Sequence, residues 1–383
     1  MRLALRCKKC VVLVPSGICW WGSLGAVNNP GKVAIIGGGL AGSALAHQCK
    51  QNGAYPIIFE RENALARAAS GNDTGLVSPR ISAEMDRYAH YFSIGFQSVV
   101  RLFSDITQDG AADVAWNQCG TMHLVVDDRK KKQFEKCVKN WGWDKKDMHI
   151  LSKEDVSKQA GIALNHDALF LPLSGNISPR KLCAYYARDA QLHLGQDIGD
   201  HMLGDLDADI IVLACANGLN NFELARHIPF GAVRGQVTQV RGGQLSASLR
   251  CNLNYAGYCT PANEDGLHMI GATFQRWLGH TDIIAQDDLD NIDALRAVAP
   301  DMAGGLRIAG HRAGLRCSVR DYFPVVGHLG RIGGKDVYIS GGHGSHGIIS
   351  SHMAARVIID EIMGREPALP EATLRALSPH RFL

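Results

Sequence analysis

Short apolar runs rich in β-branched residues recur along the chain, and they have the pattern of strands buried on both faces of a parallel sheet. They span residues 33–36, 57–59, 209–215 and 336–340. The first and the last run enter glycine-rich turns, and stretches with a helical pattern follow these turns at 43–52 and 348–363. Because the runs share one order of strand and turn, they predict a single parallel-sheet domain assembled from three separate parts of the chain.

The segments between these parts have a different pattern. Residues 121–126, 232–240 and 267–274 alternate or cluster as strands of an antiparallel sheet do. We therefore predict an α/β protein in which a discontinuous Rossmann-like domain is joined to a second, antiparallel-sheet (α+β) domain. The predicted boundaries are residues 31–110, 179–225 and 304–383 for the first domain, 111–178 and 226–303 for the second, and 1–30 for an N-terminal extension.

Composition narrows the classes of protein that this pattern allows. Of the 383 residues, 46% are hydrophobic and 20% are charged, which excludes a largely disordered chain. A net charge of +3 excludes a generally basic nucleic-acid coat, although it leaves room for a local basic patch. The 11 cysteines are irregularly spaced and odd in number, which indicates reduced thiols and a cytoplasmic protein. Cys7 and Cys10 have the spacing of a metal site, but no second pair completes it, so we expect no metal.

The N-terminal residues 1–30 combine basic residues with an uncharged stretch, as an export signal does. Pro15 and several glycines interrupt this stretch, and Trp20 and Trp21 stand where a cleavage site needs small residues. We therefore expect an extension ahead of the first domain, with an export signal as the alternative. No later apolar run reaches the length of about 18 residues that a membrane span needs, so we expect no membrane partner.

The strongest local signal is a glycine turn between the first predicted strand and the first predicted helix. Gly37 permits the tight turn, Gly39 lets a pyrophosphate approach the backbone at a helix N-terminus, and Gly42 lets helix and strand pack closely. Glu60 closes the second predicted strand, where an acid hydrogen-bonds ribose hydroxyls. The strand before this motif, the helix after it and the acid in place together predict an adenine-dinucleotide site.

Two further segments favour FAD over NAD as the dinucleotide. One is the small polar loop at 69–75, and the other is the glycine-rich turn at 341–347. A nicotinamide-binding domain does not need a C-terminal segment that comes back to the dinucleotide site. A flavin, in contrast, needs backbone donors and a helix N-terminus near its pyrimidine carbonyl. The predicted FAD-binding residues are Gly37, Gly39, Leu40, Ala41, Gly42, Glu60, Arg61, Ser70, Gly71, Asn72, Gly75, Gly342, Gly344, Ser345, Gly347 and Ile348.

Several motifs together resemble the D-amino-acid-oxidase-like FAD enzymes. They are the glycine turn with Glu60, the ASGNDTG loop at 69–75, the VRGQ sequence at 233–236 and the GLRCSVRDYFPVVG segment at 314–327. Within that superfamily, the segments 69–80, 169–179, 315–321 and 344–347 are similar to the oxidoreductase half of the bifunctional enzyme that makes 5-methylaminomethyl-2-thiouridine in tRNA. That enzyme carries a methyltransferase domain ahead of its flavin half. Residues 1–30 are too short for such a domain, so we expect the oxidative step alone.

The resemblance implies oxidation of a carbon–nitrogen bond, in which hydride leaves the carbon next to an amine and the resulting imine hydrolyses. Arg316, in Gly-Leu-Arg, matches the position that binds a substrate carboxylate in the resembling amine oxidases, with a structural ion pair as the alternative. Tyr258 and His311 are further candidates for the catalytic face, or else packed residues. His343 and His346 flank the predicted flavin loop, where they either tune the flavin or face solvent.

A basic run at residues 129–146 contains Trp141 and Trp143. It fits either a solvated helix face or a surface that contacts tRNA phosphates, with an indole stacking on a base. The favoured function is conversion of carboxymethylaminomethyl-uridine at the tRNA wobble position to aminomethyl-uridine, with release of glyoxylate. The alternatives are an oxidase of a free amino acid such as glycine, sarcosine or a D-amino acid, and a flavin-stabilised RNA-binding module.

Overall fold

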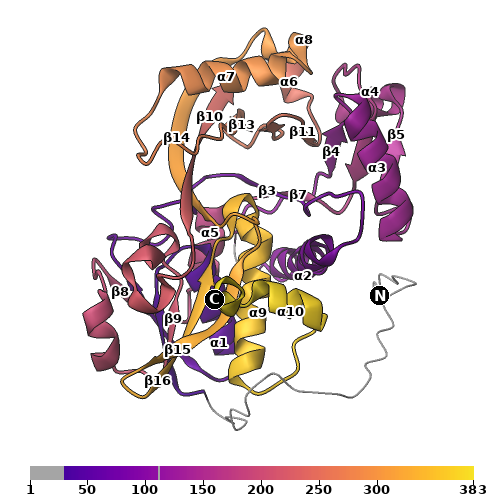
Figure 1. The fold of residues 1–383 in the computed structure, drawn as a ribbon. Coiled ribbons are helices and arrows are strands. Elements are labelled where there is room, and N and C mark those ends of the chain that lie inside the picture. The colour runs from indigo at the N-terminus through magenta and orange to yellow at the C-terminus, as the bar shows by residue number, and fades with distance from the viewer. Residues whose placement is uncertain (1–29, 111–112) are drawn as a thin grey trace.

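The computed structural model describes residues 30–110 and 113–383, which form two lobes (Figure 1). The lower lobe in Figure 1 contains a six-stranded sheet in the order β15-β16-β9-β1-β2-β8. Its parallel strands are β1 (Lys32–Ile36), β2 (Tyr55–Glu60), β8 (Gln191–Leu194), β9 (Ile210–Leu213) and β16 (Lys335–Gly341). The edge strand β15 (Val325–Ile332) is antiparallel to β16. The predicted parallel-sheet core, assembled from separate parts of the chain, is confirmed.

Helices cover this sheet because its strands are apolar on both faces. Val33 and Ile35 of β1 belong to one buried cluster, which they share with residues of the helices α1 and α9. Ala34 and Ile36 belong to a separate buried cluster, as the alternation of side chains along a strand requires. The helices of this lobe are α1 (Leu40–Gln51), α2 (Arg87–Gln108), α5 (Pro179–Tyr186), α9 (Gly347–Ile362) and α10 (Glu371–Leu377), with short 3-10 turns η1 (Asp200–Asp205), η2 (Ala216–Asn221), η3 (Glu223–Ala225), η4 (Gly344–His346) and η5 (Pro379–Phe382).

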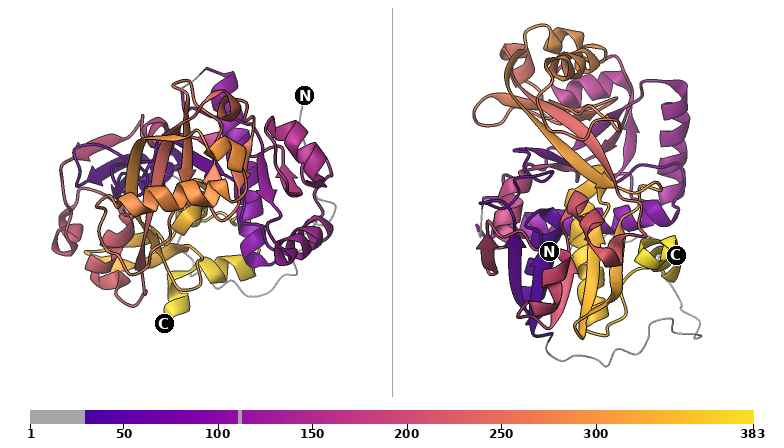
Figure 2. Two further views of the ribbon diagram at one scale, coloured as in Figure 1. Left: turned by 90° about the horizontal axis from the view of Figure 1, so that it is seen from above. Right: turned by 60° about the vertical axis from the view of Figure 1, so that its left-hand side comes forward.

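The upper lobe contains an eight-stranded sheet in the order β14-β10-β13-β12-β11-β4-β6-β5. Neighbouring strands are antiparallel except β11 and β4, which run parallel. The long strands β10 and β14 run from this lobe toward the lower one (Figure 2). The strands are β4 (Thr121–Leu124), β5 (His149–Leu151), β6 (Ala168–Leu171), β10 (Gly231–Arg241), β11 (Asn252–Asn254), β12 (Tyr258–Cys259), β13 (Leu267–Gly271) and β14 (Arg307–Ser318).

The remaining elements pack around this sheet or connect the lobes. The strands β3 (Gly75–Val77) and β7 (Gly175–Ile177) form a small antiparallel pair. The helices of the upper lobe are α3 (Asp128–Trp141), α4 (Lys153–Ala160), α6 (Gln244–Ala247), α7 (Ala285–Arg296) and α8 (Pro300–Ala303). A second lobe with a largely antiparallel sheet is therefore present, as the sequence predicts.

One strand lies on the other side of a predicted domain boundary. The sequence places residues 304–383 in the first domain, whereas β14 pairs with β10 from Arg307 to Ser318 in the upper sheet. Its first half is largely exposed and contains arginine, histidine and glycine, so it lacks the apolar pattern that predicts a strand. The other domain boundaries stay predictions.

Three predictions concern features outside the described residues or absent from them. Cys7, Cys10 and nearly all of the predicted extension lie outside the described part of the chain. Within residues 30–110 and 113–383, no helix is long and apolar enough to cross a bilayer. The same ranges contain no group of three His, Cys, Asp or Glu side chains placed to hold a metal ion.

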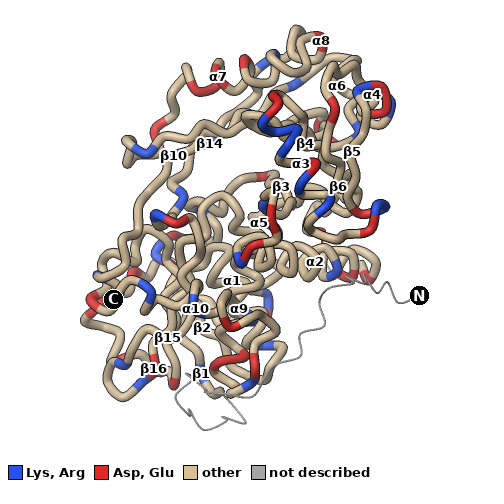
Figure 3. The backbone as a smooth tube through the Cα atoms, turned by 45° about the vertical axis from the view of Figure 1, so that its right-hand side comes forward, with Lys and Arg blue, Asp and Glu red and all other residues tan. Residues whose placement is uncertain are grey.

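The basic run forms the helix α3 and the turn after it, and Figure 3 shows its Lys and Arg positions in blue. Phe134, Cys137 and Trp141 are the buried residues of α3, and Lys130 is partly buried over the Phe134 ring. The exposed lysines of the helix are Lys131, Lys132, Lys136 and Lys139. The Trp141 indole is buried and donates to the Ser82 carbonyl over 3.0 Å. Trp143 stacks on Phe96 with ring centroids 5.9 Å apart. The buried Trp141 is therefore not placed to stack on RNA, whereas for the partly buried Trp143 that hypothesis stays a prediction.

Candidate active site

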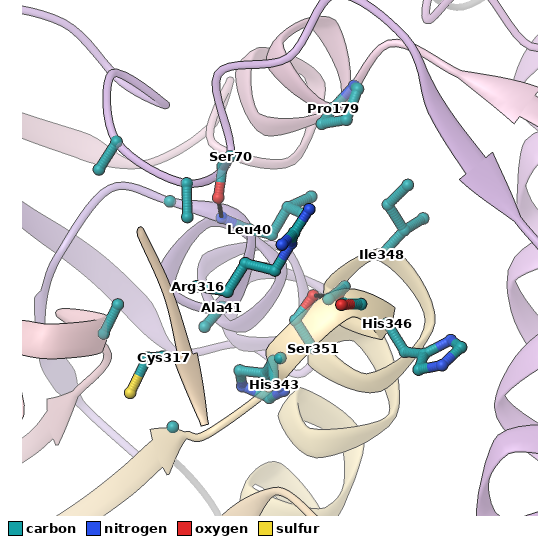
Figure 4. A pocket seen from close by; sticks show the side chains of 18 of the residues that line it. Leu40, Ala41, Ser70, Pro179, Arg316, Cys317, His343, His346, Ile348 and Ser351 are labelled. Atoms are coloured by element: carbon teal, nitrogen blue, oxygen red, sulfur yellow. Dashed lines mark hydrogen bonds between the residues drawn. The ribbon is translucent and has the colours of Figure 1, made fainter. Parts of the chain in front are cut away.

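A cavity of about 590 Å³ lies between the two sheets and is lined by residues of both lobes (Figure 4). From the lower lobe come the β1–α1 turn, the end of β2, the loop at 68–79 and the β16–α9 turn. From the upper lobe come residues of β4, β12, β13 and β14. Segments far apart in the sequence thus meet at the carboxyl ends of β1, β9 and β16, the edge where ligands bind in α/β sheets.

The β1–α1 turn is shaped by two glycines that leave no room for a side chain. Gly37 has φ +113°, and a Cβ there would lie 2.7 Å from the Ala214 carbonyl oxygen. A Cβ on Gly42 would overlap the Gly37 carbonyl oxygen. A Cβ on Gly39 would have only the Ser70 side chain within 4 Å among the described residues, so the backbone stays open to the cavity. This turn fits the pyrophosphate of a dinucleotide, as the motif predicts.

Glu60 connects this turn to the end of β2. One carboxylate oxygen accepts from the Gly38 backbone N–H over 2.7 Å, and the other accepts from the Glu62 N–H over 2.9 Å. The carboxylate lines the cavity and retains lone pairs for ribose hydroxyls. Ser70 accepts from the Leu40 backbone N–H over 3.0 Å, which ties the loop at 68–79 to the first turn of α1. These contacts form a cradle that fits the adenosine half of FAD.

The structure brings nearly all predicted FAD-binding residues to one cavity. The two exceptions support it from behind: Gly42 packs against the turn, and a Cβ on Gly71 would come within 2.5 Å of the Ala66 carbonyl oxygen. The lining members of the predicted set are Gly37, Gly39, Leu40, Ala41, Glu60, Arg61, Ser70, Asn72, Gly75, Gly342, Gly344, Ser345, Gly347 and Ile348.

Arg316 extends from β14 into the cavity, toward the space bounded by α1 and α9 (Figure 4). Its Nη1 donates to the Thr273 carbonyl oxygen over 3.3 Å, and no described carboxylate forms an ion pair with it. Burial lowers the pKa of Arg316, but a guanidinium stays charged at neutral pH. Gly235 on β10 provides the space, since a Cβ there would overlap the Arg316 guanidinium. The cavity therefore holds a positive charge with no ion-pair partner among the described residues.

Tyr258 lines the same part of the cavity, whereas His311 does not. Burial raises the pKa of Tyr258 to about 12, so its phenol stays protonated. His311 lies on β14 with Nδ1 3.1 Å from a carboxylate oxygen of the buried Asp288. Arg316 lies five positions after His311, and an odd spacing places two side chains on opposite faces of a strand. The structure therefore does not bring His311 to the cavity that holds Arg316 and Tyr258.

Three neutral imidazoles also line the cavity. His343 is held between the Ser340 and Ser350 hydroxyls at 3.1 Å and 2.9 Å, and His123 contacts the Ser78 hydroxyl over 3.0 Å. Burial lowers the pKa of His123, His343 and His346 to about 4. At neutral pH these groups can accept or donate a hydrogen bond but add no charge. His123 escapes prediction, because no local motif surrounds this residue of β4.

Because several histidines are buried with a lowered pKa, we expect the free energy of unfolding to fall in acid. Their folded-state pKa lies below the usual value of 6.5, so the folded protein binds fewer protons than the unfolded chain. Stability is therefore fully present above pH 6.5 and is lost as the pH falls toward 4. We expect the free energy of unfolding in urea to drop by about 1.4 kcal/mol per pH unit for each such histidine between pH 6 and 5. The residues are His47, His123, His343 and His346, with pKa about 4, and His352, with pKa about 3. A free energy of unfolding that stays constant from pH 7.5 to 5 would contradict this reasoning.

Comparison with known proteins supports an FAD site in this cavity. The family model of FAD dependent oxidoreductases matches residues 32–361. Two curated relatives are named tRNA 5-methylaminomethyl-2-thiouridine biosynthesis bifunctional protein MnmC. The one from Pseudomonas savastanoi pv. phaseolicola is 29% identical over 96% of this chain and 61% of its own length. The one from Methylobacillus flagellatus is 28% identical over 92% of this chain and 59% of its own length. The chain thus spans about three fifths of each relative.

Solved structures show the same fold at lower identity. Glycine oxidase from Bacillus cereus superposes with a TM-score of 0.74 at 21% identity, covering 88% of this chain and 98% of its own. Iminodiacetate oxidase from Chelativorans superposes with a TM-score of 0.78 at 19% identity, covering 91% of this chain and 98% of its own. Since the family model matches most of the chain and the cavity has the cradle that the cofactor needs, the protein belongs to the FAD-dependent oxidoreductase family and uses FAD.

Proposed function

We propose that the protein oxidises the carboxymethylaminomethyl group of a tRNA wobble uridine to an aminomethyl group and releases glyoxylate. The observation that carries this proposal is Arg316, a charged guanidinium in the cavity without a described carboxylate partner. A buried charge of this kind is costly unless a ligand compensates it. The carboxylate of a carboxymethylamine supplies the missing charge and can accept two parallel hydrogen bonds from the guanidinium.

The chain's own residues would orient the substrate for a two-electron oxidation. When bound, FAD accepts the hydride that leaves the carbon between the amine and the carboxylate. Arg316 fixes the carboxylate, and Tyr258, which stays protonated, can position a polar group beside it. His343 and His346 are neutral at neutral pH, so they can hydrogen-bond to the substrate but add no charge near its amine. The oxidised C=N bond then reacts with water, which leaves the primary amine on tRNA and glyoxylate in solution.

One observation supports tRNA as the carrier of this amine, and another supports the type of amine. The curated relatives are named for a step of tRNA uridine modification. Iminodiacetate, which names one of the structural neighbours, is itself a secondary amine with carboxymethyl groups. Oxidation of a free amino acid is the second candidate, because glycine oxidase shares the fold and Arg316 would bind any amino-acid carboxylate.

A product assay tests the proposal. The protein is incubated with tRNA that carries carboxymethylaminomethyl-uridine, and the nucleosides are analysed by mass spectrometry together with released glyoxylate. We expect aminomethyl-uridine and glyoxylate in equal amounts, and neither with tRNA that lacks the modification. Rapid oxidation of glycine or sarcosine, with the modified nucleoside unchanged, would favour the second candidate.

The exposed side of α3 provides a second prediction about tRNA. We propose that lysines of this helix contact phosphates near the cavity, because Phe134 of the same helix packs against His123, which lines the cavity, with ring centroids 6.2 Å apart. Replacing Lys130, Lys131 and Lys132 with Ala should make the log–log dependence of tRNA affinity on salt shallower by roughly two or three units. The rate of flavin reduction at saturating tRNA should change little, since these residues do not touch the reacting carbon. An unchanged salt dependence would remove α3 from the tRNA site.

A further inference from the structure

The loop between β13 and α7 presents exposed aromatic side chains where the cavity opens. Phe274 is 48% exposed and also lines the cavity, and Trp277, three residues later, is 76% exposed. Tyr322, in the turn after β14, is 39% exposed. Large aromatic side chains with this much exposure commonly mark contact surfaces when several lie together. The function described so far does not use them.

An arginine joins two of these rings, Phe274 and Tyr322, and Trp277 follows it directly in the chain. The Arg276 guanidinium carbon lies 5.6 Å from the centroid of the Phe274 ring and 5.0 Å from that of the Tyr322 ring. We call Phe274, Arg276, Trp277 and Tyr322 the aromatic rim. No Asp or Glu occurs between residues 272 and 281, so the loop adds positive charge without an acidic neighbour in sequence. An aromatic surface with this charge fits a partner that combines flat rings with negative charge.

Buried bonds hold the loop of the rim in place. The backbone of Gln275 exchanges two hydrogen bonds with that of Arg234, each 2.9 Å long. The Arg234 side chain is fully buried, binds the Gln275 side-chain oxygen over 2.6 Å and forms an ion pair with Asp287. Gln275 is held by this network, whereas Phe274, Arg276 and Trp277 are exposed. A loop already fixed in this way loses little conformational entropy when a ligand binds.

We propose that the aromatic rim stacks the unpaired anticodon-loop nucleotides that flank the reacting uridine. Bases offer a flat π-face whatever their sequence, and stacking on aromatic side chains is the usual way in which proteins bind single-stranded RNA. Arg276 can stack on a base or bind the phosphate between two nucleotides. Because Phe274 belongs to both the rim and the cavity, nucleotides on the rim would hold the modified side chain of the uridine at the cavity entrance. This inference rests on the proposed function, since it requires tRNA as the substrate.

Trp277→Ala tests the proposal, since this residue does not line the cavity. One lost stacking contact is worth about 1–3 kcal/mol, so we expect tRNA to bind roughly 5- to 150-fold more weakly. The rate of flavin reduction by the free carboxymethylaminomethyl-uridine nucleoside should stay the same. Trp277→Phe keeps a ring and should restore most of the affinity. Leu245→Ala is the matched control, because Leu245 is 64% exposed on α6, and it should leave tRNA affinity unchanged.

The possible outcomes distinguish a failure of this inference from a failure of the proposed function. If the parent protein oxidises modified tRNA and Trp277→Ala binds it equally well, the rim has no role in RNA binding and the inference is wrong. If Trp277→Ala converts a dimer to a monomer in sedimentation without changing tRNA affinity, the rim contacts a second copy of the chain and the inference is again wrong. If the parent neither binds nor oxidises modified tRNA, the proposed function fails and the inference fails with it.

Discussion

Replacing Arg316 with Met is expected to lower kcat/KM for a carboxylate-bearing amine roughly ten- to a hundred-fold while the FAD content stays unchanged. A charge-assisted, bidentate contact contributes about 1.5–3 kcal/mol, and each factor of ten corresponds to about 1.4 kcal/mol. Arg316→Lys keeps the charge but loses the planar pair of donors, so its activity should lie between those of the parent and the Met variant. Steady-state kinetics together with the flavin absorbance of each purified variant provide the measurement.

Two further variants test whether the loss of kcat/KM is caused by the loss of the Arg316 guanidinium from its position. Arg307→Met removes an exposed arginine from the start of the same strand and should have no effect. Gly235→Ala leaves Arg316 intact but places a Cβ where its guanidinium lies, so it should reproduce much of the loss. If Arg316→Met loses FAD instead of activity toward the substrate, Arg316 is a structural residue and its assignment to the substrate carboxylate is wrong.

Replacing Gly42 with Ala is expected to abolish tight FAD binding. The added Cβ would overlap the Gly37 carbonyl oxygen, a backbone atom that cannot move without shifting α1 away from β1. Such a shift would displace the turn that faces the pyrophosphate, and overpacking of this kind costs typically about 1–3 kcal/mol of stability. The ratio of flavin to protein absorbance after purification measures the loss directly.

Gly305→Ala is the matched control for this change. Gly305 has no atom within 4 Å of the position a Cβ would take, so the same chemical change should leave FAD content and melting temperature as they are. Added FAD at about a hundred times its dissociation constant should stabilise the parent and the control by about 2.7 kcal/mol. A Gly42→Ala protein that purifies with a full complement of FAD would contradict the role assigned to this turn.

The lower lobe could be predicted from the sequence because its signals are local. The strands around Ile35 and Ile58 are short apolar runs. The tight turn after the first of them requires glycine at Gly37 and Gly42, so the residues themselves indicate the turn. The edge strand β15 and the strand β14 have mixed polar and apolar residues, and their place depends on the partners β16 and β10. Pairing between distant segments leaves little trace in the residues of a partly exposed strand.

In the cavity, too, residues in local motifs could be predicted, whereas residues that meet from distant parts of the chain could not. Residues of the FAD cradle lie in motifs that predict them, whereas His123 and Ser78 meet across 45 positions of the chain. His311 lies outside the cavity because its face on β14 depends on the register of that strand and not on its neighbours in sequence. Trp141 has the sequence context of an RNA contact but is buried inside the protein. The exposed Trp277 has no charged run around it and could be found only from the structure.

Anaerobic stopped-flow reduction of the bound flavin is the most direct test of the proposed function. The oxidised holoenzyme is mixed with tRNA bearing carboxymethylaminomethyl-uridine, with unmodified tRNA, or with glycine or sarcosine, and the flavin absorbance is followed. The proposed function predicts rapid and complete bleaching with the modified tRNA, none with the unmodified tRNA, and at most slow bleaching with the free amino acids. Rapid bleaching by glycine or sarcosine, without any response to modified tRNA, would contradict tRNA as the substrate while leaving the fold and the FAD site intact.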